Sequence, residues 1–117
     1  TLVGAGGSGF FVNARCDLFL KEPDQSRHAA LLAPAIERAA AYAGAGASGF
    51  FAPGLRDPAL ITDLCKASPL PVNILAFPGM AGRQALADCG VARISHGPFP
   101  WRQAMAGVTE AARAAML

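Results

Sequence analysis

One short pattern occurs twice in this chain of 117 residues and limits what the chain can fold into. The sequence SGFFVNAR at residues 8–15 returns forty residues later as SGFFAPGL at residues 48–55. Aromatic and β-branched side chains that follow a glycine favour an extended backbone over a helix. A strand that recurs at this period, with a helix-length segment in between, predicts a repeated strand–helix unit.

Two more short strands are predicted downstream, PVNIL at residues 71–75 and VARIS at residues 91–95, each bounded by glycine or proline. Asp57 followed by Pro58 suits the start of a helix, and Gly90 suits the end of another. Strands that alternate with helices at this spacing predict an α/β fold with an all-parallel sheet and right-handed crossovers. The helical pattern covers residues 29–43, 58–66, 81–88 and 101–116.

Polar side chains gather where two of the predicted strands end. Asn13, Arg15 and Asp17 come at the end of the first strand, and Ser95 and His96 at the end of the fourth. Ligands of parallel α/β folds bind at the rim formed by the carboxyl ends of the strands. Because side chains alternate along a strand, Asn13 and Arg15 share one face. The opposite face, predicted to be fully buried, carries Phe10, Val12 and Ala14.

Arg15 is the strongest candidate for ligand binding, because a guanidinium at the end of a strand can bind a carboxylate through two parallel hydrogen bonds. The alternative is an ion pair with Asp17, which is predicted to orient Arg15 or to form a turn. Asn73 lies in the middle of the third strand, where its amide must be satisfied by a ligand or by neighbouring backbone. Ser95 and Asn13 complete the candidate substrate-binding set, with local hydrogen bonds as their alternative.

The remaining chemically active residues are predicted to be structural. His28 lies in a polar segment before a helix and is expected in solvent. His96 is expected to point away from Ser95 and towards the helices, and Arg93 is expected to stabilise the end of the sheet far from the rim. The cysteines are expected to be buried as small apolar residues: Cys16, Cys65 and Cys89.

The opening sequence GAGGSG fits the spacing G-x-G-x-x-G through Gly4, Gly6 and Gly9, which suggests a dinucleotide-binding domain of the Rossmann type as an alternative. Asp24 lies about where an acidic ribose ligand is sought. This alternative requires a helix directly after Gly9, over residues 10–20. The residues FFVNAR that follow favour a strand instead.

Composition excludes several partners. The formal net charge is only +2 and the basic residues form no stripe, so no nucleic-acid surface is expected. Every apolar run is interrupted well before the ~20 residues of a bilayer span, so no membrane partner is expected either. The odd and widely spaced cysteines indicate neither a disulfide framework nor a zinc site, and they favour a cytoplasmic location. The first residue is Thr1 rather than methionine, which raises the possibility of a longer protein.

Four segments in this order resemble the phosphoenolpyruvate mutase and isocitrate lyase superfamily: FFVNARCDLFL, AIERAAAYAGAGASGFFAPGL, LPVNILAFPG and GVARISHGP. The segment NARCD is similar to the family's A-R-T-D, with Cys16 in place of the threonine. The segment PVN matches the one that carries a substrate-facing asparagine in the family. APGL resembles the VPGL of bacterial phosphomutase-like members, which stands where the lyases have a glutamate.

The resemblance implies a (β/α)₈ TIM barrel, of which residues 1–117 supply the C-terminal half with the fifth to eighth strands. It implies a Mg²⁺-dependent lyase or phosphomutase that acts on a small 2-oxo acid or related carboxylate, with the Mg²⁺ ligands in the N-terminal half. It also implies a homo-oligomer in which the last helix contacts another subunit. A catalytically inactive, self-associating barrel remnant is a further alternative, because a half-barrel exposes strand edges and an apolar inner face.

Overall fold

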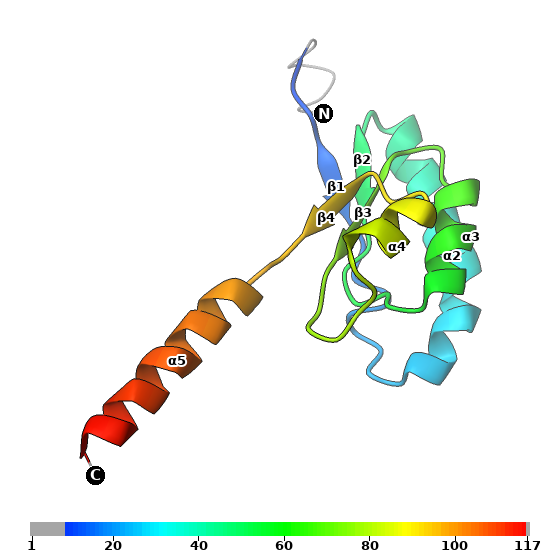
Figure 1. The fold of residues 1–117 in the computed structure, drawn as a ribbon. Helices are drawn as coiled ribbons and strands as arrows, with labels where there is room; N and C mark the ends of the chain where they lie inside the picture. Colours follow the sequence, from blue (N-terminus) through cyan, green and yellow to red (C-terminus); the bar gives the residue numbers. More distant parts are fainter. Residues whose placement is uncertain (1–8, 117) are drawn as a thin grey trace.

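The computed structural model describes residues 9–116, and these residues form a four-stranded parallel sheet with helices between the strands (Figure 1). The order of strands in the sheet is their order along the chain. Each strand pairs in parallel with the next, with Ala14 beside Phe50, Phe51 beside Asn73, and Leu75 beside Ser95. The strands are β1 (Asn13–Arg15), β2 (Gly49–Phe51), β3 (Val72–Leu75) and β4 (Arg93–Ser95).

The helices alternate with the strands as the sequence predicts. A short 3₁₀ turn, η1 (Gln25–Arg27), leads directly into the first long helix. The helix predicted at residues 81–88 begins two residues later than predicted, and the helix predicted at residues 101–116 begins two residues earlier. The α-helices are α2 (His28–Gly44), α3 (Pro58–Ala67), α4 (Arg83–Asp88) and α5 (Phe99–Met116).

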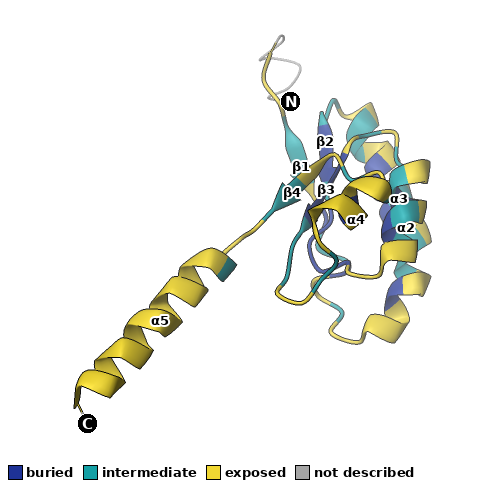
Figure 2. Ribbon diagram, in the orientation of Figure 1, coloured by how far each residue is buried: buried dark blue, intermediate teal, exposed yellow. Residues whose placement is uncertain are grey.

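Helices α2, α3 and α4 lie together on one side of the sheet, and the core lies between them and the strands (Figure 1). Phe50, Val72 and Ile74 contribute the strand side of this core, because alternation points them towards the helices. The helix side is made by the buried residues Ala35, Ala39, Ile61, Leu64 and Leu86. Figure 2 shows the same asymmetry, with burial concentrated in β2, β3 and the inner faces of α2 and α3.

The first strand is less buried than the sequence predicts. Phe10 is 70% exposed and lies before β1, while Val12 and Ala14 are half-buried. The prediction that Phe10, Val12 and Ala14 form a fully buried face is therefore wrong within the described chain. β1 is an edge strand of the described sheet, so it has a neighbour on one side only.

The segment after Gly9 also decides against the dinucleotide alternative. Residues 10–20 contain strand β1 and turns, not the helix that a phosphate-binding loop must lead into. Gly9 has φ +85°, a backbone conformation that glycine adopts readily and other residues rarely adopt. Gly4 and Gly6 lie outside the described residues.

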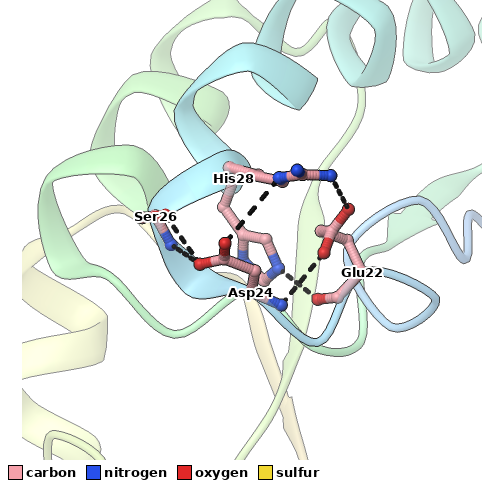
Figure 3. A network of polar contacts seen from close by, with 5 residues as sticks. Glu22, Asp24, Ser26 and His28 are labelled. Atoms are coloured by element: carbon pink, nitrogen blue, oxygen red, sulfur yellow. Dashed lines mark hydrogen bonds and ion pairs between the residues drawn. The ribbon is translucent and has the colours of Figure 1, made fainter.

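The entry into α2 is a compact polar network (Figure 3). Asp24 caps η1, and its Oδ1 accepts hydrogen bonds from the Ser26 backbone N–H at 3.0 Å and from the Ser26 hydroxyl at 2.6 Å. These two bonds hold the pKa of Asp24 below its usual value, the hydroxyl bond contributing most. The Glu22 carboxylate accepts from the Asp24 N–H at 3.0 Å. Asp24 is thus engaged in helix capping.

The expectation for His28 is wrong. Its side chain is 2% exposed and packs edge-on against Phe19, with 5.3 Å between the ring centroids. Nε2 of His28 lies 2.8 Å from the Glu22 carbonyl oxygen, so this nitrogen carries the proton and donates. The imidazole is buried because the turn at Glu22 supplies the hydrogen-bond acceptor that burial of a polar ring requires.

Helix α5 extends away from the rest of the molecule (Figure 1). All residues from Pro100 to Met116 are exposed, and Figure 2 shows α5 in the colour of exposed residues except at its first residue. The radius of gyration is 17.2 Å, whereas a compact domain of this length has about 13 Å. Within the described chain, this helix therefore does not cover the outside of β4.

Candidate functional site at the carboxyl ends of the strands

Arg15 and Asp17 form an ion pair at the carboxyl end of β1. Nε of Arg15 lies 2.5 Å from Oδ1 of Asp17, and Nη2 lies 3.3 Å from Oδ2, so the guanidinium and carboxylate meet through two contacts. The hydrogen bond that Arg15 donates to Asp17, with the charge of Asp17 as the second cause, raises the pKa of Arg15 above its ordinary value. The side chain of Arg15 remains 52% exposed. Asp17 therefore orients the guanidinium without removing it from solvent.

A cavity of about 700 Å³ opens beside Arg15 at this rim. Its polar lining comes from Arg15, Arg93, Ser95, His96 and Arg102. Its apolar walls come from Leu20, Phe51, Pro53, Leu75, Phe77, Ile94, Pro98 and Phe99. Among the residues that the structure describes, no carboxylate lines the cavity, so its polar character is cationic.

Two residues in this lining were predicted to be structural. Arg93 lines the rim cavity instead of stabilising the far end of the sheet, because β4 is only three residues long and rises about 7 Å from its first residue to its last. His96 lines this cavity and also the groove beside α4. The prediction that His96 faces the helices is therefore met in part, since it borders the rim cavity as well.

Asn13, Asn73 and Ser95 form a hydrogen-bonded row across the open face of the sheet. Oδ1 of Asn73 accepts from Nδ2 of Asn13 at 2.9 Å and from the Ser95 hydroxyl at 3.1 Å. Nδ2 of Asn73 donates to the Arg93 carbonyl at 3.0 Å and to the Ile74 carbonyl at 3.2 Å. Asn73 is 2% exposed. Its amide is thus satisfied entirely by the protein.

The row depends on a glycine in the strand between its members. Asn13 lies beside Gly49 in the β1–β2 register, and it reaches across β2 to Asn73 on β3. A Cβ atom at Gly49 would lie 2.9 Å from Asn13 Oδ1 and 2.8 Å from the Phe11 ring. Of the four candidate site residues, Arg15 and Ser95 line the cavity. Asn73 accepts a hydrogen bond from Ser95, and Asn13 donates to the same oxygen of Asn73.

An aromatic wall closes one side of the cavity. The rings of Phe77 and Phe99 lie 4.9 Å apart, and the Arg56 guanidinium stacks 3.8 Å from the centre of the Phe77 ring. Phe77, Phe99 and Arg102 were missed by sequence reasoning. Their positions directly after β3 and in the first turn of α5, following strand ends, are the signal that could have identified them.

The cysteines do not extend the site. Cys16 is buried, as predicted, and its sulfur lies 3.9 Å from Nη1 of Arg38. Cys65 and Cys89 are half-buried. Burial raises the pKa of the Cys65 thiol to about 11, with the neighbouring Cys89 adding to the effect. Cys65 therefore remains a protonated thiol near neutral pH and makes a poor nucleophile.

A cluster of metal ligands and a membrane-spanning helix are both absent from the described residues. Residues 9–116 contain no group of three or more His, Cys, Asp or Glu side chains that could hold a metal ion. Within the same range, no helix has the length and apolar character needed to cross a membrane.

Comparison with known proteins connects this chain to one family. The family model described as phosphoenolpyruvate phosphomutase matches residues 3–116. Two uncharacterized proteins of Mycobacterium tuberculosis, from strains CDC 1551 / Oshkosh and ATCC 25618 / H37Rv, are each 38% identical over 104 residues. That match covers 89% of this chain and 38% of each relative.

Solved structures give the same result. A crystal structure from Burkholderia cenocepacia J2315, named as a phosphonomutase, superposes with a TM-score of 0.88 at 45% identity, over 97% of this chain and 45% of that one. A second from the same organism, named as a lyase/mutase, superposes with a TM-score of 0.80 at 32% identity, over 95% of this chain and 40% of that one. The chain spans less than half the length of each of these relatives.

The parallel sheet, its helices and these superpositions identify a partial TIM-barrel-like fold. The ordered motifs predicted the same superfamily from the sequence, and the family model covers nearly all of the chain. This protein belongs to the phosphoenolpyruvate phosphomutase family, within the phosphoenolpyruvate mutase and isocitrate lyase superfamily.

Proposed function

We propose that this chain is the C-terminal half of a (β/α)₈ barrel, with β1 to β4 as its fifth to eighth strands, and that it supplies the carboxylate-binding side of a lyase or mutase. The substrate in this proposal is a small 2-oxo acid or related carboxylate. The observation that carries the proposal is the cationic cavity at the carboxyl ends of the strands, the edge where barrels of this type bind their ligands.

The charges of the cavity support an anionic ligand. Arg15, Arg93 and Arg102 all line it, and a guanidinium binds a carboxylate through a planar pair of N–H donors. Fixed cations also stabilise negative charge that develops on a substrate, as in an enolate. The aromatic wall of Phe77 and Phe99 shields that side of the cavity from water, which strengthens these interactions.

The role of Asp17 in this proposal is to hold the Arg15 guanidinium in place. Its carboxylate contacts Nε and Nη2 and leaves the cavity lining free of negative charge. A preoriented guanidinium loses less side-chain freedom when a ligand binds.

The proposal gives the residues of this chain no part in holding Mg²⁺. Residues 9–116 contain no group of three or more His, Cys, Asp or Glu side chains that could hold a metal ion, and the proposal places the Mg²⁺ ligands in the N-terminal half of the barrel. The proposal therefore assigns to this chain the binding and orientation of the carboxylate and no step that passes through a metal.

The test is direct binding of oxaloacetate and of phosphonopyruvate to the complete chain, measured by calorimetry and by the rise in melting temperature. The change Arg15→Met removes charged hydrogen bonds and is expected to weaken binding by about tenfold or more. Arg113→Met, on the exposed part of α5, is the matched control and should bind as the parent does. Equal affinity in the Arg15 and Arg113 variants would contradict the proposal.

We also propose that the chain forms a homo-oligomer through α5. Trp101, Met105 and Val108 are 65%, 41% and 60% exposed, and their i, i+4, i+7 spacing makes one apolar stripe. A helix this exposed gains little stability in water without packing partners. A groove of about 600 Å³ beside β4 and α4, lined by apolar residues that include Leu86, Val91 and Ile94, is a surface on which such a helix of a second copy fits.

The alternative of an inactive, self-associating remnant makes a different prediction. It also requires association through exposed surfaces such as α5, but it requires that no carboxylate raises the melting temperature. An oligomer whose melting temperature does not rise with any carboxylate would favour the inactive remnant over the proposed carboxylate-binding half of an enzyme.

A further inference from the structure

The orientation of the Asn73 amide is fixed by its neighbours. One end of the amide faces the carbonyl oxygens of Arg93 and Ile74, at 3.0 Å and 3.2 Å. Carbonyl oxygens only accept hydrogen bonds, so the amide nitrogen must occupy this end. The oxygen of Asn73 therefore faces Asn13 and Ser95. The assignment follows from the protein backbone and needs no ligand.

This orientation determines what the Ser95 hydroxyl can do. Oδ1 of Asn73 carries no hydrogen, so the contact of 3.1 Å to Ser95 Oγ requires the Ser95 proton to lie between them. A serine hydroxyl has one proton and two acceptor lone pairs. Once the proton is committed to Asn73, Ser95 can only accept hydrogen bonds at the cavity that it lines.

The three arginines of the polar lining have the opposite character. Arg15, Arg93 and Arg102 can only donate. Within residues 9–116, no protein group donates a hydrogen bond to Ser95 Oγ. The cavity thus presents several donors suited to carboxylate oxygens and, at Ser95, an acceptor suited to a ligand O–H or N–H.

We propose that Ser95 is a specificity-determining residue that accepts a hydrogen bond from a hydroxyl group of the bound carboxylate, and that Asn73 is the positioning residue that sets this polarity. The inference rests on the proposed carboxylate site and narrows its substrate class to hydroxy acids. An oxo or unsubstituted acid of the same size places a carbonyl or a C–H against Ser95 and forms no hydrogen bond there. Asn73 itself does not touch the ligand.

The probes are succinate and both enantiomers of malate, which share two carboxylates and differ by one hydroxyl. Calorimetry on the complete chain is expected to show one malate enantiomer binding about fivefold or more tightly than succinate. Ser95→Ala should abolish this preference and leave succinate binding unchanged. Ser95→Thr, which keeps the hydroxyl, should restore it. Melting temperatures of all variants establish that they are folded.

The outcomes separate this inference from the carboxylate site itself. Arg15-dependent binding of all three acids with equal affinity would overturn the role of Ser95 and leave the proposed function standing. A malate preference that survives in Ser95→Ala would overturn it as well. Absence of Arg15-dependent binding by any of the acids would overturn both proposals.

The role of Asn73 is tested separately by Asn73→Leu, which removes the acceptor for the Ser95 proton and lets Ser95 donate. In a folded variant, the preference should shift from malate towards oxaloacetate, whose carbonyl accepts a hydrogen bond. A merely structural Asn73 would weaken both ligands alike, and that result would remove its positioning role. Gln84→Leu, which removes an exposed amide from α4 far from this row, is the matched control and should retain the malate preference.

Discussion

Gly49 shows how one residue without a side chain controls the polar face of the sheet. Because Gly49 has no side chain, the side chain of Asn13 can cross β2 and reach Asn73. A Cβ at Gly49 would lie 2.9 Å from Asn13 Oδ1. Gly54 is glycine for a different reason. It has φ +93°, and a Cβ would lie 2.6 Å from the backbone nitrogen of Leu20. The first constraint comes from a side chain that can move, the second from backbone that cannot.

These two glycines give a paired prediction. Gly49→Ala is expected to lower the free energy of unfolding by about 1 kcal/mol, because it displaces Asn13 from a hydrogen bond. In an Asn13→Ala background the same change should cost clearly less. Gly54→Ala is expected to cost about 2 kcal/mol or more in either background, because a positive φ costs about 1–2 kcal/mol and the new Cβ also meets the Leu20 backbone. Urea unfolding measures all of these values, and equal costs of Gly49→Ala with and without Asn13 would refute the explanation.

The site was predictable from sequence only in part. The Arg15–Asp17 pair was one of two named alternatives, because both residues lie on one short segment. The row through Asn13, Asn73 and Ser95 was not predicted as a row, because it depends on how all four strands are aligned and on the space left at Gly49. Those are properties of tertiary packing that no local sequence window contains.

At the scale of elements, local signals were reliable where the chemistry is local. Asp57 caps α3 as predicted, with its Oδ1 accepting from the Ala59 N–H at 2.8 Å, and Gly90 follows α4 with φ +96°. The entry to α2 was misjudged at His28, because its polar neighbours suggested solvent. The acceptor that allows its burial is the backbone carbonyl of Glu22, which composition cannot show.

The cap at Asp24 predicts an acid response of this entry. The pKa of Asp24 is lowered in the folded state, mainly by the Ser26 hydroxyl and next by the Ser26 backbone N–H. A lowered pKa stabilises the fold above the unfolded-state value, about 3.9, and that stabilisation is lost as the pH falls through the folded-state value. Asp24→Asn still caps a helix, so its melting temperature near pH 7 should change little.

Thermal melts between pH 6 and pH 2 check this prediction. The parent should lose melting temperature more steeply below about pH 4 than Asp24→Asn does. Asp63→Asn, which changes an exposed carboxylate of α3, is the control and should follow the parent profile. Identical profiles for the parent and Asp24→Asn would contradict the role of the cap.

At the scale of the whole molecule, two features stand out together. One face of the sheet has the helices α2, α3 and α4, while α5 lies apart from the core with its apolar stripe exposed (Figures 1 and 2). Sequence periodicity predicted a helix over residues 101–116, and α5 covers them. It could not predict that α5 leaves the core, because the same pattern serves for packing onto its own sheet and onto a neighbour.

The proposed association predicts a change of mass on α5 substitution. Light scattering of the parent at micromolar concentration is expected to give a mass above that of the 12.0 kDa monomer. Met105→Glu combined with Val108→Glu places charges in the apolar stripe and should give a monomer. Gln103→Glu, on the opposite side of the helix, should leave the mass unchanged. A parent that is monomeric under these conditions would remove the proposal.

The agreement between strand order and chain order has a consequence for how the protein is made. Within residues 9–116, each strand pairs only with strands adjacent to it along the chain, so no pairing among these four strands waits for a distant segment. The ribosome synthesises the chain from its amino end, so β1 is already available when β2 emerges, and β2 is available when β3 emerges. The sheet can grow by accretion during synthesis, with short loop closures at each step. We expect nascent chains that end after β3 to protect the backbone amides of β2 from hydrogen exchange before β4 exists.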